Sequence, residues 1–163
     1  TVSFDCAAAL SAYTLERLRP RCRALFEVLL CEDAGLLLAR SLLSKAQAAS
    51  QEGRELRVAS LGGGPGFDVV AILATLEALR SGLAQQPVAQ IWDSEELPAC
   101  CAVRGRVLDL AQGWGPAVEA VAEVASRVFP FQDAGCVDLV APVDLRIPDS
   151  PETLAEVEVA DVV

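Results

Sequence analysis

Residues 56–67 read LRVASLGGGPGF, and this short stretch decides the fold that the sequence predicts. Its first half is an apolar run that predicts a buried β-strand at residues 56–61. The glycines that follow are typical of a tight turn. Beyond the turn, apolar residues recur every three or four positions, which predicts a helix from Phe67 to about Gly82. A strand, a tight turn and a helix in this order form the first half of a β-α-β unit.

The chain after this unit continues to alternate between strands and helices. Further strands are predicted at residues 106–110 and 137–143, and a fourth strand opens at 160–163. Residues 84–105 contain two prolines and an acidic run, and predict an insertion with one short strand at 88–92. Alternating strands and helices predict an α/β fold, with a parallel sheet and helices on both of its faces.

The helix after the second strand is predicted to begin at Gly115-Pro116, because proline is favoured at the first helical position. Residues 147–151 are rich in proline and predict a turn. The helix that begins at Gly115-Pro116 has a predicted buried face with Val118, Val121, Val124 or Ala125, and Val128.

The first 53 residues show almost no strand signal and predict two or three helices. Pro20 is expected to break or start one of them, and Gly35 to mark a joint. The chain therefore divides into a helical segment, residues 1–53, that packs on a sheet-containing part, residues 54–163. The apolar positions at helical spacing are Leu25, Leu29, Cys31, Leu36, Leu37, Leu38, Leu42 and Leu43.

Composition narrows the classes of function. A length of 163 residues with 53% hydrophobic residues predicts one domain with its own core. A net charge of −10 disfavours extended binding to nucleic acid, because such a field repels phosphate backbones. The one dense basic stretch, residues 16–23, lacks interleaved aromatic residues and is expected to be a solvated helix face. The longest apolar runs are too short for a membrane span, so we expect a soluble protein.

The residue types that are absent exclude several chemistries. The chain contains no histidine, so a Ser-His-Asp triad, a Cys-His pair and a histidine general base are excluded. Its six cysteines form no CxxC pair, which disfavours a zinc site. Adjacent Cys100 and Cys101 are read either as a redox pair or as reduced cysteines packed among apolar residues. The second interpretation is favoured and indicates a reducing compartment.

Several motifs compete at the glycine turn. A dinucleotide fingerprint, G-x-G-x-x-G, would need its third glycine at the position of Phe67. A phosphate-binding P-loop would need a Gly-Lys-Ser/Thr sequence where the helix opens with Gly66-Phe67-Asp68. What remains is G-x-G-x-G at Gly62, Gly64 and Gly66, or a turn with a purely structural role.

The G-x-G-x-G turn resembles the methionine-binding turn of class I S-adenosylmethionine-dependent methyltransferases. The resemblance implies a Rossmann-like fold over residues 56–163 and S-adenosylmethionine as cofactor, held by Gly62, Gly63, Gly64 and Gly66. The lack of Lys or Arg in the turn also suits a cationic sulfonium better than a phosphate.

The resemblance further implies two acidic contacts to the cofactor. Asp109, after the second strand, is expected to accept hydrogen bonds from the ribose hydroxyls. It follows Gly66 at about twice the ~20 residues usual in dinucleotide-binding folds, so Asp93 is the rival ribose ligand. Asp144 is expected near the adenine amino group, and its alternative is a turn carboxylate paired with Arg146.

Two departures from the family pattern bear on function. Ser60 stands where the family commonly has an acidic residue, and the chain ends at its fourth strand, before the segment that positions the methyl acceptor. The fourth strand would then have an open apolar edge. We therefore expect a truncated form, or a piece completed by a protein partner that covers this edge. The alternative to methyl transfer to an unknown acceptor is a catalytically inactive, methyltransferase-like scaffold subunit, and a nucleotide-dependent oxidoreductase is disfavoured by Phe67.

Overall fold

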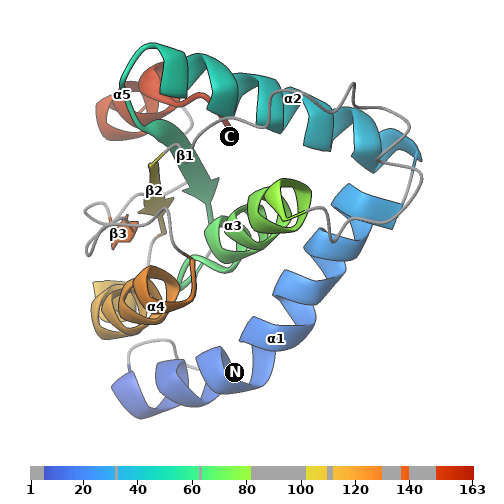
Figure 1. Ribbon diagram of the computed structural model, residues 1–163. Coiled ribbons are helices and arrows are strands. Elements are labelled where there is room, and N and C mark those ends of the chain that lie inside the picture. The colour runs from blue at the N-terminus through green and yellow to red at the C-terminus, as the bar shows by residue number, and fades with distance from the viewer. Residues whose placement is uncertain are drawn as a thin grey trace.

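The computed structural model describes residues 6–31, 33–62, 64–81, 102–109, 112–129, 137–139 and 150–163 (Figure 1). The chain begins with two long helices and then alternates between strands and helices, as an α/β fold does. The elements are α1 (Ala7–Cys31), α2 (Asp33–Gln51), β1 (Leu56–Leu61), α3 (Phe67–Arg80), β2 (Val103–Leu108), the short 3-10 helix η2 (Gln112–Trp114), α4 (Gly115–Val128), β3 (Val137–Leu139) and α5 (Pro151–Val159).

The three described strands form a parallel sheet, as the sequence predicts, and their order is β1-β2-β3. Leu56 is in register with Val103 at the start of β1 and β2. Near the end of the chain, Val162 forms a parallel bridge with Val58. The amide of Leu56 donates to Ala102 beside β2, whereas the amide of Ala59 donates to Val162. Since adjacent residues of a strand bond to opposite edges, Val162 lies on the edge of β1 away from β2.

Helices lie on both faces of this sheet, as predicted. A Cβ atom added at Gly105 of β2 would lie 2.7 Å from Cγ1 of Val69, which belongs to α3. The next residue, Arg106, is bonded instead to Glu156 of α5. Consecutive strand residues point to opposite faces, so α3 and α5 cover opposite faces of the sheet.

The strand boundaries differ from the prediction in β2. This strand begins at Val103, inside the stretch predicted to be an insertion, and ends at Leu108. Gly105 has no side chain and so interrupts the apolar pattern, yet its bare backbone is where Val69 packs. The predicted third strand is confirmed at Val137–Leu139. Its continuation to residue 143 and the predicted strand at 88–92 lie outside the described residues.

Helix α3 begins at Phe67, as predicted, and ends at Arg80. Ser81 caps it: the Ser81 backbone amide donates to the carbonyl of Glu77, and so does its hydroxyl, at 2.7 Å. The predicted end at Gly82 lies just outside the described residues.

Helix α4 begins at Gly115 with proline in its first turn, as predicted. Val118 and Val121 are buried, and of the alternatives Val124 and Ala125 it is Ala125 that is buried. Val128 is 61% exposed, so its predicted burial is wrong. The helix ends at Val128, and the following Phe129 packs against the core in its place.

The described part of residues 1–53 forms two helices, and the expectation for Pro20 is wrong. Pro20 does not end a helix but lies inside α1. Figure 1 shows α1 changing direction along its length, as expected where proline removes a backbone hydrogen bond. In α2, Leu36, Leu42 and Leu43 are buried, whereas Leu37 and Leu38 are exposed, because three consecutive residues cannot share one helix face.

Helix α5 was not predicted, because residues 147–151 read as a turn. Ser150 is its N-cap: the Ser150 hydroxyl accepts a hydrogen bond from the Thr153 amide at 3.2 Å. Pro151 occupies the first helical position, where a missing N–H costs nothing. The same proline that suggested a turn therefore starts a helix.

One hydrophobic core joins the N-terminal helices to the sheet. Its buried members include Leu10 of α1, Leu43 of α2, Val58 of β1, Leu73 of α3 and Val118 of α4. Figure 1 shows α1 and α2 extending around α3. Within the ranges that the structure describes, no helix combines the length and apolarity that a membrane crossing requires.

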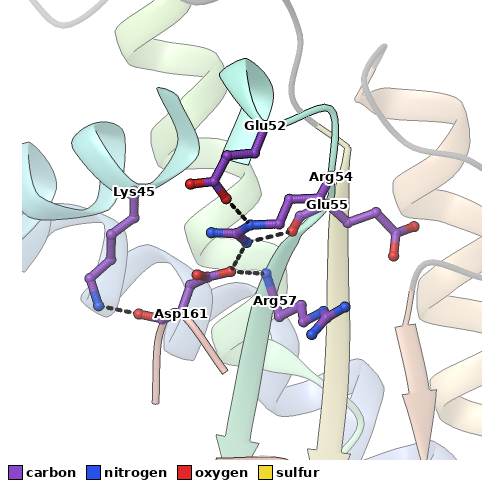
Figure 2. A network of polar contacts seen from close by, with 6 residues as sticks. All are labelled: Lys45, Glu52, Arg54, Glu55, Arg57 and Asp161. Carbon is purple, nitrogen blue, oxygen red and sulfur yellow. Dashed lines mark hydrogen bonds and ion pairs between the residues drawn. The ribbon is translucent and has the colours of Figure 1, made fainter. Parts of the chain in front are cut away.

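A polar network ties residue 161 to the start of β1 (Figure 2). Oδ2 of Asp161 accepts hydrogen bonds from Nη1 of Arg54 at 2.7 Å and from the Arg57 amide at 2.9 Å. Lys45 of α2 donates to the Asp161 carbonyl. Glu52 forms an ion pair with Nε of the Arg54 guanidinium. Burial opposes ionisation of Asp161, but the bonds from Arg54 and Arg57 outweigh it and lower the pKa of Asp161.

Asp161→Asn is expected to destabilise the protein at about pH 7, with a deficit that shrinks as the pH falls below about 4. A carboxyl group with a lowered pKa in the folded state stabilises that state above its unfolded pKa, and this contribution disappears as the group is protonated. Urea unfolding of both proteins across this pH range measures the difference. A deficit that is the same at every pH would contradict the role of the charge.

Candidate functional site

The glycine turn lies at the carboxyl end of β1, as predicted. Gly62, Gly64 and Gly66 have φ angles of 65°, 57° and 90°. These left-handed conformations are readily accessible to glycine and strained for other residues. The Gly62 amide donates to the carbonyl of Leu108 at 2.8 Å, which fastens the turn to the end of β2.

Space is also limited at the last glycine of this turn. A Cβ atom on Gly66 would lie 3.3 Å from Cγ1 of Val137 and 3.4 Å from Cγ2 of Val107. The N-terminus of α3 therefore sits directly on β2 and β3. A Cβ on Gly64 would make ordinary contact, at 3.5 Å, with the Trp114 ring, so there only the positive φ angle calls for glycine.

Asp109 lies at the same edge of the sheet, immediately after β2. Its Oδ2 accepts a hydrogen bond from the Gly64 amide at 3.1 Å. The structure thus brings Asp109 to the glycine turn, although it lies far along the sequence from Gly62, Gly64 and Gly66. Asp109 is half-buried. The remaining predicted site residues, Gly63 and Asp144, and the rival ribose ligand Asp93 lie outside the described residues.

A second carboxylate adjoins the turn. The Ser60 hydroxyl, buried in β1, donates to Oδ2 of Asp68 at 3.0 Å. Asp68 occupies the first turn of α3, where a negative charge complements the helix dipole. The sequence showed both residues but not their contact, because eight positions and a tight turn separate them. The site therefore has one carboxylate from α3 and one from the end of β2.

Helix α1 covers the start of α3. The Cys22 thiol donates to the Phe67 carbonyl at 3.2 Å. Burial, and then the negative charge of Asp68, raise the pKa of Cys22 to about 11. A thiol with so high a pKa is a poor nucleophile near neutral pH. Cys22 is therefore a packing residue that links α1 to the site.

An aromatic cluster from three elements lies beside the turn. Tyr13 of α1 stacks on Phe67 with ring centroids 6.3 Å apart, and its centroid is 5.8 Å from that of Trp114. The Arg21 guanidinium lies 5.8 Å from the centroids of both Tyr13 and Phe67. The sequence pattern gave no signal for this cluster, because α1 is more than forty residues away from its partners.

The geometry limits the chemistry of the site. The site consists of a glycine turn, two carboxylates and an aromatic wall. In the part of the chain that the structure describes, no three metal-ligating side chains gather into one group. Its carboxylates can accept hydrogen bonds from the hydroxyl groups of a ligand.

Compared with protein-family models, with curated proteins and with solved structures, the chain matches none of them. The case for a function therefore rests on the residues and their geometry.

Proposed function

We propose that this chain binds S-adenosylmethionine at the carboxyl edge of its sheet and belongs to a methyltransferase with a Rossmann-like fold. The observation that carries the proposal is the bond between Asp109 and the Gly64 amide. It brings the two predicted cofactor contacts, a glycine turn after one strand and a carboxylate after the next, to the same point. A carboxylate accepts several hydrogen bonds, so a bond to the turn is compatible with a bond to a ribose.

The arrangement of strands supports the proposed fold. With Val162 beside β1, the spatial order is β3, β2, β1 and then the 161–163 segment. This is the order in which a doubly wound sheet begins, and its ligands bind outside the carboxyl ends of the strands where the order reverses. The glycine turn follows β1, which borders that reversal.

Asp68 is a further residue that supports the proposal. The family commonly has an acidic residue where this chain has Ser60, but Asp68 places a carboxylate 3.0 Å from the Ser60 hydroxyl. We infer that Asp68 provides the negative charge that would attract the methionine amine of the cofactor. Its location in the first turn of α3 keeps this charge next to the glycines.

Methyl transfer suits a chain without histidine. The sulfonium of S-adenosylmethionine is already an activated electrophile, so the reaction depends mainly on holding the acceptor in line with the methyl group. Backbone amides and carboxylates orient the cofactor without any proton transfer. Residues other than those of the glycine turn would hold the methyl acceptor. The free thiols of Cys6 and Cys22 are consistent with a reducing compartment.

A methyltransferase-like scaffold subunit is the second candidate, and the same bond is the observation that favours it. A carboxylate that satisfies an amide of its own turn is also what a turn with a purely structural role would contain. In that case a protein partner at the sheet edge would provide the function. Cofactor binding separates the two candidates.

The proposal predicts saturable binding of S-adenosylmethionine by the chain, measured by isothermal titration calorimetry, with no binding of NADH or ATP. Trp114 provides an independent signal because its ring touches Gly64. In a Trp92→Phe variant Trp114 is the sole tryptophan, and the cofactor is expected to change its fluorescence. If calorimetry detects no heat of binding and the Trp114 fluorescence does not change, cofactor binding is rejected and the scaffold candidate is favoured.

A further inference from the structure

The face of the sheet beneath α5 carries three arginines, although the chain as a whole has a net charge of −10. Arg57 of β1 lies directly opposite Arg104 of β2, and Arg106 lies opposite Ala59. Residues two positions apart share one face of a strand, so the three arginines point to the same side. Parallel sheets usually bury apolar residues on both faces. This face departs from that rule.

The three arginines line a cavity of about 300 Å³ between the sheet and α5. We call it the arginine cavity, and the described charged residues of its lining are Arg57, Arg104, Arg106, Glu55 and Glu156. Its volume is at the lower end of the range of small-molecule sites. It lies on the face of the sheet, whereas the glycine turn lies at the carboxyl edge, so the two sites are separate.

Two of the arginines are paired with glutamates from the same lining. Arg106 makes a two-point bond with Glu156, with Nε to Oε2 at 3.1 Å and Nη2 to Oε1 at 2.8 Å. Arg104 lies 3.7 Å from the Glu55 carboxylate. Among the described side chains of the lining, these two pairs leave Arg57 as the arginine without a carboxylate partner.

Arg57 is the third arginine of the lining. Its backbone is fixed, because its amide donates to Asp161 and its carbonyl accepts from the amides of Asp161 and Val162. Its guanidinium has no polar partner among the described side chains. Figure 2 shows the Arg57 side chain extending away from the Asp161 carboxylate. The exposed Arg57 lies directly opposite Arg104 on the neighbouring strand, and like charges in such a pair are destabilising.

We propose that the arginine cavity binds a small molecule carrying a phosphate or diphosphate group. Guanidinium groups match phosphate oxygens in charge and in two-point geometry, better than a lysine would. Arg57 and Arg104 contact the anion from adjacent strands. Glu156 holds Arg106 at the wall of the cavity and keeps α5 in place above it. The overall negative charge excludes a long nucleic-acid backbone and favours a compact ligand.

Binding of inorganic pyrophosphate to the full chain tests this proposal, by isothermal titration calorimetry at low ionic strength. Wild-type protein is expected to bind saturably. Arg57→Gln is expected to weaken the affinity by about tenfold or more, because it removes one charge-assisted contact. Arg40→Gln is the matched control, since Arg40 is an exposed arginine of α2 outside this cavity, and it should retain wild-type affinity. Thermal unfolding of all three proteins verifies that each is folded.

Two further measurements define the ligand and the site. Citrate, a carboxylate of similar charge, is expected to bind more weakly than pyrophosphate, and Asp109→Ala should leave pyrophosphate affinity unchanged. The proposal is overturned if wild-type protein does not bind pyrophosphate, if Arg57→Gln and Arg40→Gln bind alike, or if citrate binds as tightly. None of these outcomes depends on S-adenosylmethionine, so this proposal and the proposed function fail independently.

Discussion

Gly35→Ala is expected to lower the free energy of unfolding by about 3 kcal/mol, at the upper end of what overpacking costs. A Cβ atom at this position would lie 1.7 Å from the Val28 carbonyl oxygen and 3.1 Å from Cα of Leu29. These are backbone atoms of α1, so no side chain can rotate away from the clash. The two helices would have to separate, exposing Leu29 and Leu36, both of which are buried.

A loss of stability in Gly35→Ala is informative, because alanine is intrinsically favoured over glycine inside a helix by about 1 kcal/mol. Urea unfolding measures the difference. Gly115→Ala is the matched control: Gly115 also belongs to a helix, and a Cβ there would meet nothing within 4 Å. It should be neutral or slightly stabilising. If Gly35→Ala behaved like the control, the close crossing of α1 and α2 would be refuted.

Asp109→Ala is expected to weaken binding of S-adenosylmethionine by tenfold or more. Losing a hydrogen bond to a charged group costs about 1.5–3 kcal/mol. The substitution also leaves the Gly64 amide without the acceptor that holds the turn. Asp109→Asn retains one carbonyl oxygen for that amide but loses the charge, so its affinity should fall between wild type and Asp109→Ala.

Calorimetry on a set of variants gives this prediction its controls. Glu119→Ala removes an exposed carboxylate from α4 and should leave cofactor affinity unchanged. Asp93→Ala tests the rival ribose ligand. If Asp93→Ala proves more damaging than Asp109→Ala, the ribose contact belongs to residue 93. Unfolding curves recorded alongside distinguish lost affinity from a lost fold.

The parts of the fold that the sequence predicted are those with a local cause. Gly62, Gly64 and Gly66 mark the turn because each has a positive φ angle, which is a local property of the backbone. Phe67 opens α3 and Pro116 lies in the first turn of α4 for similarly local reasons. Each of these features needs no information about distant residues.

The features that were missed depend on tertiary partners. Gly105 reads as a break in a strand until Val69 is seen to pack on it. Pro20 reads as a helix end, although the packing of α1 against α2 and α3 keeps the helix continuous. Tyr13 and Arg21 join Phe67 and Trp114 only because α1 crosses the start of α3. The same applies to the arginine cavity, which requires the register of two strands.

The bond between Arg54 and Asp161 joins residues more than a hundred positions apart. During synthesis, α1, α2, β1 and α3 leave the ribosome long before Asp161 does, and their mutual contacts form first. The outer edge of β1 therefore remains without its partner until residues 161–163 emerge. Such long-range closure is slow, and an unpaired strand edge invites association with other chains. A nascent chain of this protein accordingly passes through a period in which the outer edge of β1 is unpaired.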